Sequence, residues 1–562
     1  MEEALRVAEA VGALSGFVEA GRAFHVLKRI TLEHRIQGAP GLGEAVRAVE
    51  EILLSNPLLP LEVRDHEASP SSLPRWVSRP PEWSVEGAGL EARGERLRLE
   101  GHPTLAVAHS PPGGPVEAEV VEVREWWEPS AYEAASGRIA LTSGPQDVAY
   151  LLAARAGAEG LIAYNPKLSG DAVPYKGLFL PHDLLSKAGI PAVGAPSSLA
   201  AGLSGSKARL SVDSSVGGDA RLPYLEALLP GRSRGPRVAV VAHICHPRPG
   251  ANDNASGAAA VVEAALALAE AIDSGRLRPP GGDIVFLLVP EYTGSLAALA
   301  RGLRVDYAIN VDMVGVEPGG GDGPLRILPP PPPLPLEPAA ALYYALKAAG
   351  GGGWELSGPS SGSDHDAFNA YGMAAAMLNQ WPDTYYHSDR DDADRISPSR
   401  LRLAALAAAA AAYALASGYE APGFREYYTR LIAIGHASRG DGEAARLAGS
   451  TLRALYGLEP LTGGAPRLSA PWEAVEPSSP IVTPGSVTVA DVEAGARLRR
   501  ILGSGLDGYT WYLMEPVILA NQGLGAREIL AVERAVHGSG VSAEKLWEAL
   551  EILAGVGAVK LE

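Results

Sequence analysis

The sequence predicts an α/β protein with a mostly parallel, mixed sheet sandwiched by helices, a small β-rich inserted domain and a C-terminal winged-helix domain. From about residue 220 to 420, apolar runs rich in Val and Ile alternate with longer helical patterns. That alternation is typical of a parallel sheet covered by helices. Residues 85–215 differ, because they are rich in Gly and Pro and contain short β-type runs.

These patterns divide the chain into four parts. Residues 1–84 have a helical pattern and join the main domain, residues 85–215 form the insert, residues 216–475 form the main domain, and residues 476–562 form the winged helix. The tail predicts two or three helices followed by a final strand, which is the basis for the winged-helix assignment. The proline run at 328–338 predicts a stiff surface loop, because proline cannot donate to a sheet.

Composition excludes several classes of protein. Lys and Arg number 48 against 65 Asp and Glu, a formal net charge of −17, so a generally basic nucleic-acid binder is excluded. Residues 480–562 carry 10 acidic against 7 basic side chains, so we expect the tail to contact protein rather than nucleic acid. A single Cys excludes an intrachain disulfide and favours a reducing compartment.

Membrane insertion and secretion are also not expected. The N-terminal stretch MEEALRVAEAVGALSG is acidic and lacks the basic start of a signal peptide. The apolar stretch 401–418 is mostly Ala and contains Arg402, so we expect a buried helix there rather than a membrane span. We therefore predict a cytoplasmic protein.

Polar residues gather directly after a predicted buried strand, in AHICHPRPGANDNASG. This stretch contains His243, Cys245, His246 and Asp253, and a long helical pattern follows it. In α/β folds, sites are built at this position, outside the carboxyl ends of the strands.

Four later segments add residues of the same chemical kinds. Glu291 and Asp312 each follow an apolar strand, and two further segments, SGSDHDAF and TYYHSDRDDADRI, are rich in carboxylates and His. Because strand ends meet at one edge of a sheet, these side chains could converge there. Histidines and carboxylates without a thiol array suit zinc, or cobalt or manganese, in a hydrolytic site that keeps a position open for water. The candidates from the last two segments are Asp364, His365, Tyr386, His387 and Asp391.

Each residue taken alone has a structural explanation. Asp253 ahead of a helix reads as an N-cap, and the carboxylates between 389 and 394 read as a solvated acidic face. Asp312 within an apolar strand is harder to explain in this way, because an unpaired buried carboxylate is costly. The joint pattern is what favours a site.

The order of these segments resembles peptidase family M28. That family has the series His, Asp-Asn-x-Ser-Gly, Glu, Asn-x-Asp-Met, Ser-Asp-His and Tyr-His-Ser, which this chain matches from His243 to Ser388 across five segments. The HICHP form is similar to a prokaryotic branch of M28-like proteins with a C-terminal winged helix. Residues 137–196 resemble a protease-associated domain, and the fold implied is of the zinc-exopeptidase type.

The resemblance implies a role for each matching residue. Asp253 would bridge two metal ions, His243 and Asp312 would complete one site, and His387 would bind the other ion. Tyr386 stands where some relatives place a tyrosine that stabilises an oxyanion. Asp391 would hold a ligand in place.

Two departures from the family pattern leave alternatives open. The family usually has His-x-Asp, whereas this chain has Cys245, so either His243 or His246 could be the first ligand, and the thiol could be a ligand itself. The family also usually has Glu-Glu, the first as base and the second as ligand. Here Pro290 and Tyr292 flank Glu291, so Glu291 is either the general base or a ligand.

The leading hypothesis is a metal-dependent exopeptidase, most simply an aminopeptidase that hydrolyses short peptides with one or two zinc ions. Its Asp364 and Asp366 could receive the free amine of the substrate, and the insert would limit access to the cleft without joining the chemistry. The alternative is a non-catalytic binding or regulatory module with an incomplete metal site. Association into a homo-oligomer stays open.

Overall fold

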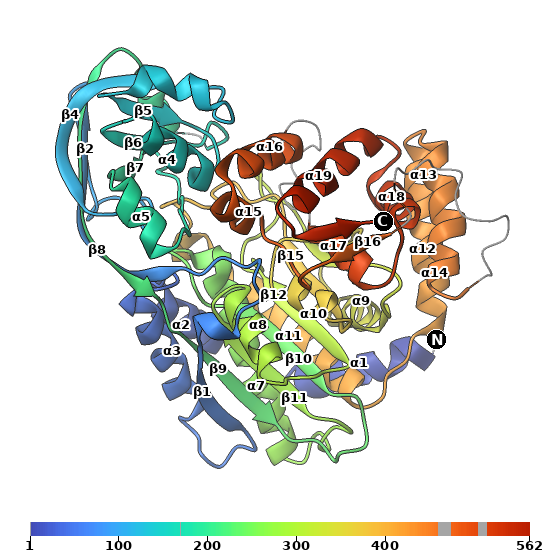
Figure 1. Cartoon of the computed structure of the whole chain (residues 1–562). Helices are drawn as coiled ribbons and strands as arrows, with labels where there is room; N and C mark the ends of the chain where they lie inside the picture. Colours follow the sequence, from blue (N-terminus) through green and yellow to red (C-terminus); the bar gives the residue numbers. More distant parts are fainter. Residues whose placement is uncertain (1, 169, 459–471, 473, 504–513) are drawn as a thin grey trace.

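The computed structural model describes residues 2–168, 170–458, 472, 474–503 and 514–562 (Figure 1). Its central sheet has the strand order β1-β9-β11-β10-β12-β15-β13-β14. Strands β10, β11, β12 and β15 run parallel in its middle. The pairs β1–β9, β9–β11 and β13–β15 are antiparallel, and β13 pairs in parallel with β14. The predicted mixed, mostly parallel sheet is therefore confirmed. The strands are β1 Glu62–Ala68, β9 Leu222–Leu229, β10 Val238–His243, β11 Ile284–Val289, β12 Tyr307–Asp312, β13 Leu325–Leu328, β14 Trp354–Leu356 and β15 Ala374–Gln380.

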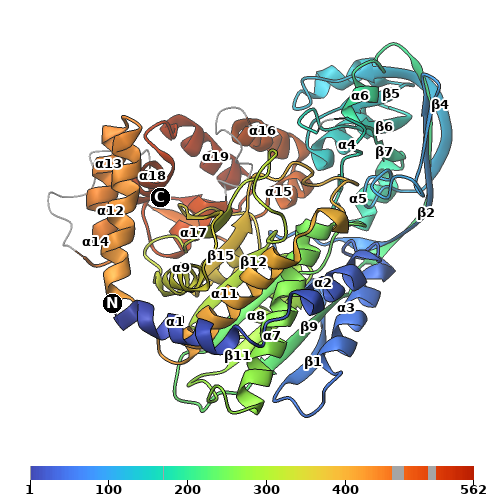
Figure 2. The same cartoon turned by 180° about the vertical axis from the view of Figure 1, so that it is seen from behind.

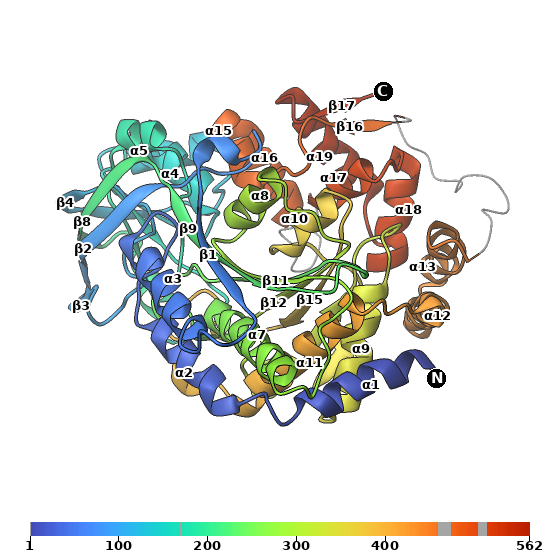
Figure 3. The ribbon, with the colours of Figure 1, turned by 90° about the horizontal axis from the view of Figure 1, so that it is seen from below.

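Helices cover both faces of this sheet, as Figure 3 shows when the strands are seen nearly end-on. Strands β10 and β11 are buried along their whole length, as apolar runs covered on both faces should be. One face carries α1 Glu2–Leu14, α2 Ala20–Thr31, α3 Pro40–Leu53, α7 Gly257–Asp273, α9 Glu337–Ala349 and α11 Pro398–Ala416. The other face carries α8 Thr293–Ala300 and α10 His365–Ala370.

Two core helices are apolar enough, by length and composition, to cross a membrane. They are Ala251–Asp273 and α11, and 89% and 78% of their most apolar windows are buried inside the protein. Helix α11 starts with Ser397 as its N-cap and Pro398 in its first turn. It packs against α7 and α9 on the face seen in Figure 2, so the predicted buried helix is found.

The proline run after β13 contradicts the prediction of a surface loop. Residues 329–332 are buried and lead into α9. Proline has no backbone N–H to satisfy, so a run of prolines loses fewer hydrogen bonds on burial than other loop residues would.

A second sheet, with the order β3-β2-β8-β4-β5-β6-β7, lies between β1 and β9 in the sequence. It is therefore an insertion between two adjacent strands of the central sheet, and it has its own apolar clusters. Its strands are β2 Pro81–Ala92, β3 Glu95–Arg98, β4 Gly113–Glu122, β5 Ile139–Thr142, β6 Gly160–Ala163, β7 Ala192–Gly194 and β8 Lys207–Asp219. Its helices are α4 Gln146–Arg155, α5 His182–Ala188 and α6 Ser197–Ala200.

The C-terminal part is mostly helical and closes with a short antiparallel pair of strands, β16 Val475–Pro477 and β17 Val559–Leu561. The winged-helix assignment of this part stays a prediction. Its helices are α12 Pro422–Ser438, α13 Gly442–Leu447, α14 Arg453–Leu455, α15 Pro484–Ala490, α16 Val492–Gly503, α17 Met514–Asn521, α18 Ala526–His537 and α19 Ala543–Gly555.

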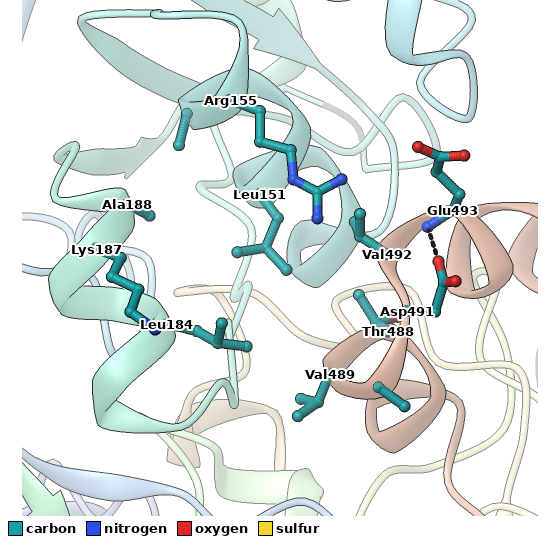
Figure 4. Close-up of a pocket in the computed structure, with 12 residues that line it drawn as sticks. Leu151, Arg155, Leu184, Lys187, Ala188, Thr488, Val489, Asp491, Val492 and Glu493 are labelled. Atoms are coloured by element: carbon teal, nitrogen blue, oxygen red, sulfur yellow. Dashed lines mark hydrogen bonds between the residues drawn. The ribbon is translucent and has the colours of Figure 1, made fainter. Parts of the chain in front are cut away.

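The insert and the C-terminal part contact one another through a buried carboxylate. Asp147 in the first turn of α4 accepts from Thr488 Oγ1 at 2.8 Å and from Arg499 at 3.1 Å. Beside this contact lies a surface pocket of about 620 Å³, with Arg155 on the insert side and Asp491 and Glu493 on the other (Figure 4). None of the predicted site residues lines it.

Candidate active site

Three predicted site residues stand at the carboxyl ends of neighbouring parallel strands. His243 ends β10, Asp312 ends β12, and Glu291 follows the end of β11 by two residues. Since β10 pairs in parallel with both β11 and β12, these three positions meet at one edge of the sheet. This is where the topology of an α/β sheet places a site.

His243 lies between two carboxylates. Its Nε2 is 3.3 Å from Asp253 Oδ1 and 3.4 Å from Asp312 Oδ1. All three side chains are at least nine-tenths buried. Together they form a group whose donor atoms could hold one metal ion.

A second group shares Asp253 through its other oxygen. Asp253 Oδ2 is 3.4 Å from His246 Nε2 and 3.1 Å from His387 Nε2. The structure thus brings both His243 and His246 to the site, in different groups. Asp253 is not the N-cap of the following helix, because α7 begins four residues later and the carboxylate faces the imidazoles.

The hydrogen bonds of the two buried histidines orient their rings. His243 Nδ1 donates to the carbonyl oxygen of Cys245 at 3.1 Å, and His246 Nδ1 donates to that of Pro247 at 2.8 Å. Burial lowers the pKa of His246, so this ring is neutral and Nε2 is left with a lone pair that faces a carboxylate oxygen. Two lone pairs at this distance repel one another unless a cation lies between them.

Unpartnered atoms mark the same place. His246 Nε2 and Asp312 Oδ1 are buried and have no hydrogen-bond partner in the described residues. Burial alone would lower the pKa of His243, but the charges of Asp312 and Glu291 raise it well above the usual value. A bound metal ion would replace that proton, since only the neutral ring is a ligand.

The turn that contains Asp253 is held by Asp391. Its carboxylate accepts from the backbone N–H of Asn252 at 2.9 Å and from that of Asp253 at 2.9 Å. Asp391 is itself buried and lies 3.4 Å from Arg395. Within the described part of the chain, its hydrogen bonds and ion pairs include the backbone of the shared carboxylate residue and no imidazole.

A buried arginine that the sequence did not single out holds the loop of His246. The guanidinium of Arg35 donates to the carbonyl oxygens of Ile244, Pro249 and Gly250 at 2.7, 2.8 and 2.6 Å. The backbones of Arg35 and His246 also exchange two hydrogen bonds of 3.1 Å. Burial lowers the pKa of Arg35 to about 10, a cost that the loop contacts must offset.

Comparison with known proteins identifies this arrangement. Residues 226–412, which contain the strand-end site, match the family model of peptidase family M28. Through this segment the chain is similar to peptidase family M28. Among curated proteins, none matches the sequence.

Solved structures show the same fold in three bacterial proteins. The zinc aminopeptidase BSAP of Bacillus subtilis is 20% identical, with a TM-score of 0.53 over 70% of this chain and 94% of its own. An M28 peptidase precursor of Shewanella amazonensis is 17% identical, with a TM-score of 0.56 over 74% and 98%. A solved protein of Clostridium acetobutylicum is 14% identical and covers 98% of both chains with a TM-score of 0.51.

Among the described residues, Cys245 is not part of any group that could hold a metal ion. Its carbonyl oxygen orients His243, which is the task that the family pattern gives to a carboxylate. Its Sγ accepts from the backbone N–H of Glu291 at 3.1 Å and lies 3.6 Å from Gln37 Nε2. Cys245 therefore supports both the histidine and the glutamate.

Glu291 lies beside both groups and belongs to neither among the described residues. Burial, together with the charges of Asp312 and Asp364, raises its pKa well above the usual value, although His243 opposes this. The next residue, Tyr292, points away from the site, because its hydroxyl donates to Asp366 at 2.9 Å.

Asp364, His365 and Asp366 form a buried support below Glu291. Asp364 accepts from Tyr292 N at 2.9 Å and from Ser295 Oγ at 2.7 Å, and burial raises its pKa to about 6. His365 Nε2 donates to a backbone carbonyl at 2.6 Å. Asp364 and Asp366 are 0% and 2% exposed, and their hydrogen bonds are to the protein itself, so the expectation that they receive a substrate amine stays a prediction.

Two tyrosines cover the histidines of the second group. The ring of Tyr386 stacks on His387 with centroids 3.8 Å apart. Tyr175, from the insert, lies 4.8 Å from the rings of both His246 and His387, and its N–H donates to the carbonyl oxygen of His387 at 2.7 Å. No motif in the sequence selects Tyr175, because only the folded chain brings the insert onto the site.

Proposed function

We propose that the chain is a zinc aminopeptidase that removes N-terminal residues from short peptides with the help of two adjacent metal ions. The observation that carries this proposal is Asp253, whose two oxygens face two different sets of ligands. A carboxylate in this position can bridge two ions. Zinc is supported by the family, by the zinc aminopeptidase among the solved neighbours and by the mixed nitrogen and oxygen donors.

The donor atoms fit this ion. Zinc binds imidazole nitrogen and carboxylate oxygen at about 2.0–2.2 Å, so two ligands at a tetrahedral angle lie about 3.4 Å apart. The four distances between imidazole Nε2 and carboxylate oxygen are 3.3, 3.4, 3.4 and 3.1 Å. His243, Asp312 and Asp253 would hold one ion, and His246, His387 and Asp253 would hold the other. Three protein ligands for each ion leave a position open, as in catalytic zinc sites.

His246 takes a ligand position that a glutamate holds in the family pattern, so Glu291 can act as the base. In the family pattern the second Glu of the pair is a ligand, and in this chain His246 occupies the second group instead. Glu291 then has no metal to bind. Its raised pKa suits a group that takes a proton from water and passes it to the leaving amine.

The chemistry of the bound ions would be to lower the pKa of a water molecule and to polarise the peptide carbonyl. The protein residues do the rest. Glu291 accepts the proton of the attacking water, and Tyr386 donates a hydrogen bond to the oxygen on which negative charge develops. Burial keeps the Tyr386 hydroxyl protonated, because it raises the pKa of this phenol well above its usual value.

Exchange of a carboxylate for an imidazole also changes the charge of the site. Asp253 and Asp312 would be the two anionic ligands of two dications. In the family pattern, the second Glu of the Glu-Glu pair would add a third anionic ligand. We therefore propose that the second ion is bound by a nitrogen-rich set that favours zinc or cobalt over manganese.

The insert supports a preference for short substrates. Val173 of the insert is hydrogen-bonded to Asp389. Tyr175 of the insert is hydrogen-bonded to His387, which is a proposed ligand. The insert thus borders the second metal group directly, and a long folded chain would have to displace it. This differs from the expected separation of insert and chemistry, since Tyr175 contacts two proposed ligands.

Blocked peptides test the proposal. The full chain, loaded with zinc, is assayed on one tripeptide in three forms: free at both ends, N-acetylated and C-amidated. We expect cleavage of the free and the amidated peptide and none of the acetylated one, and a chelator should abolish all cleavage. Loss of cleavage on amidation would make the enzyme a carboxypeptidase. No cleavage of any form by protein with both ions bound would favour the non-catalytic binding module.

A further inference from the structure

A second cluster of metal-type side chains lies far along the chain from the active site, between two C-terminal helices. His537 Nε2 is 3.0 Å from Glu515 Oε2 and 3.7 Å from Glu533 Oε2. Glu533 and His537 are four residues apart on α18 and therefore share one face of that helix. Glu515 is in the first turn of α17, so the cluster joins two helices.

This cluster is as buried as the active site. The side chains of Glu515, Glu533 and His537 are 3%, 2% and 8% exposed. Neither glutamate forms an ion pair with Lys or Arg among the described residues. A buried carboxylate without a cation is costly, and here two of them face the same imidazole.

Several polar atoms at this place have no partner. Oε1 of Glu515 and Oε1 of Glu533 are buried and form no hydrogen bond within the described chain. The same is true of the hydroxyls of Tyr428 and Tyr456, whose pKa values are raised first by burial and further by the charge of Glu515. The unsatisfied buried oxygen on each of the two carboxylates indicates that a group is needed to neutralise and coordinate them.

We propose that Glu515, Glu533 and His537 bind a single divalent transition-metal ion, separate from the ions of the active site. Two carboxylates and one imidazole are a borderline donor set, which suits Zn²⁺ and its neighbours in the first transition row better than Ca²⁺ or Mg²⁺. One dication neutralises both carboxylates at once. Protons on one glutamate and on the imidazole could balance the charge, but they would still leave a buried carboxylate oxygen without a partner.

The position of this ion gives it a structural role. It fixes the start of α17 to the end of α18. Helix α17 contacts α10, and Gln522 at its end donates to the carbonyl oxygen of Asn369 at 2.9 Å. Helix α10 follows Asp364, which holds the backbone next to Glu291, so the ion would brace the C-terminal helix that contacts this part of the catalytic domain.

Metal content of the full chain tests the site. Wild type, Glu533→Gln and the matched control Glu528→Gln, on the same helix, are equilibrated with Zn²⁺, freed of unbound metal and measured by mass spectrometry for zinc per chain. Glu533→Gln should contain one equivalent less than wild type, and Glu528→Gln should equal wild type. Equal zinc in all three would overturn the proposal. The readout is a difference between variants, so it holds whatever the zinc content and activity of the other site.

Thermal unfolding gives an independent second readout. In a chelator, Glu533→Gln should melt no lower than wild type, because the amide has the shape of the carboxyl group and brings no charge into the buried cluster. In excess Zn²⁺ wild type should melt above the variant, since only wild type gains from binding at this site. Should Glu533→Gln fail to fold, His537→Gln takes its place and must lose the same equivalent of zinc. A melting order that does not depend on zinc would also overturn the proposal.

Discussion

The two halves of the active site rest on different kinds of backbone. His243 and Asp312 end buried parallel strands. The pairing of these strands in the central sheet fixes the positions of the two residues. His246 and His387 stand in loops, and His387 has a left-handed backbone with a φ of 53°. The first half is positioned by the sheet, whereas the second half needs contacts from residues distant in the sequence.

Those distant contacts come from three directions. Arg35 holds the loop of His246 from 209 residues away, and Asp391 holds the turn of Asp253. Tyr175 of the insert packs against both loop histidines. The strand-borne half therefore depends on the central sheet, while the loop-borne half also depends on contacts from the N-terminal segment and the insert.

The largest effect should come from the base, which belongs to neither half. Glu291→Gln removes the proton acceptor and leaves all ligands, so kcat should fall by about 10²–10⁴-fold with zinc content unchanged. Rates on a peptide substrate and zinc per chain are measured together, with Glu355→Gln on β14 as the control. A loss of one zinc equivalent, with activity restored by excess metal, would make Glu291 a ligand.

The next effect separates the two halves. His246→Ala should lose one zinc equivalent and most activity, while the ion of the strand-borne half stays. Its matched variant is His243→Ala, which should lose the other ion and keep the one bound by the loops. Equal zinc in wild type and His246→Ala would show that His246 is no ligand and would remove the distinction between the halves.

Removal of Arg35 should weaken the loop half through its backbone. Arg35→Met leaves three buried carbonyl oxygens without their charged donor, and we expect a loss of about 3 kcal/mol or more in the free energy of unfolding. Denaturant unfolding measures this loss. In folded protein, zinc titration should show weaker binding of one ion and unchanged binding of the other; equal weakening of both would contradict a separate loop half.

The smallest effect concerns Cys245. Cys245→Ala removes the acceptor of the Glu291 N–H, and one such hydrogen bond is worth about 1 kcal/mol, so activity should fall roughly fivefold with zinc unchanged. Cys245→Ser, which keeps an acceptor, should recover part of that loss. Loss of zinc in Cys245→Ala would instead indicate a thiolate ligand.

The same division explains what the sequence could predict. Apolar strands with a polar residue at their carboxyl end predicted the sheet and the positions of His243, Asp312 and Glu291. The separate places of His246 and Cys245 could not be predicted, because they depend on contacts with Arg35 and Gln37 across the fold.

One expectation based on residue type differs from what the structure shows, and another stays a prediction. The proline run was expected on the surface as a stiff loop, yet residues 329–332 are buried, since they have no N–H groups to leave unpaired. Asp364 and Asp366, which were expected to receive the substrate amine, are both buried against Tyr292. In both cases the sequence shows which residue types are present, but the groups that they pack against follow only from the folded chain.

An anomalous-scattering map at the zinc edge, from crystals of the full chain, tests the central claim most directly. We expect two adjacent peaks, the first bound by His243 and Asp312 and the second by His246 and His387, with Asp253 touching both and Glu291 touching neither. One peak at this edge of the sheet, or a second peak bound by Glu291 and not by His246, would contradict it.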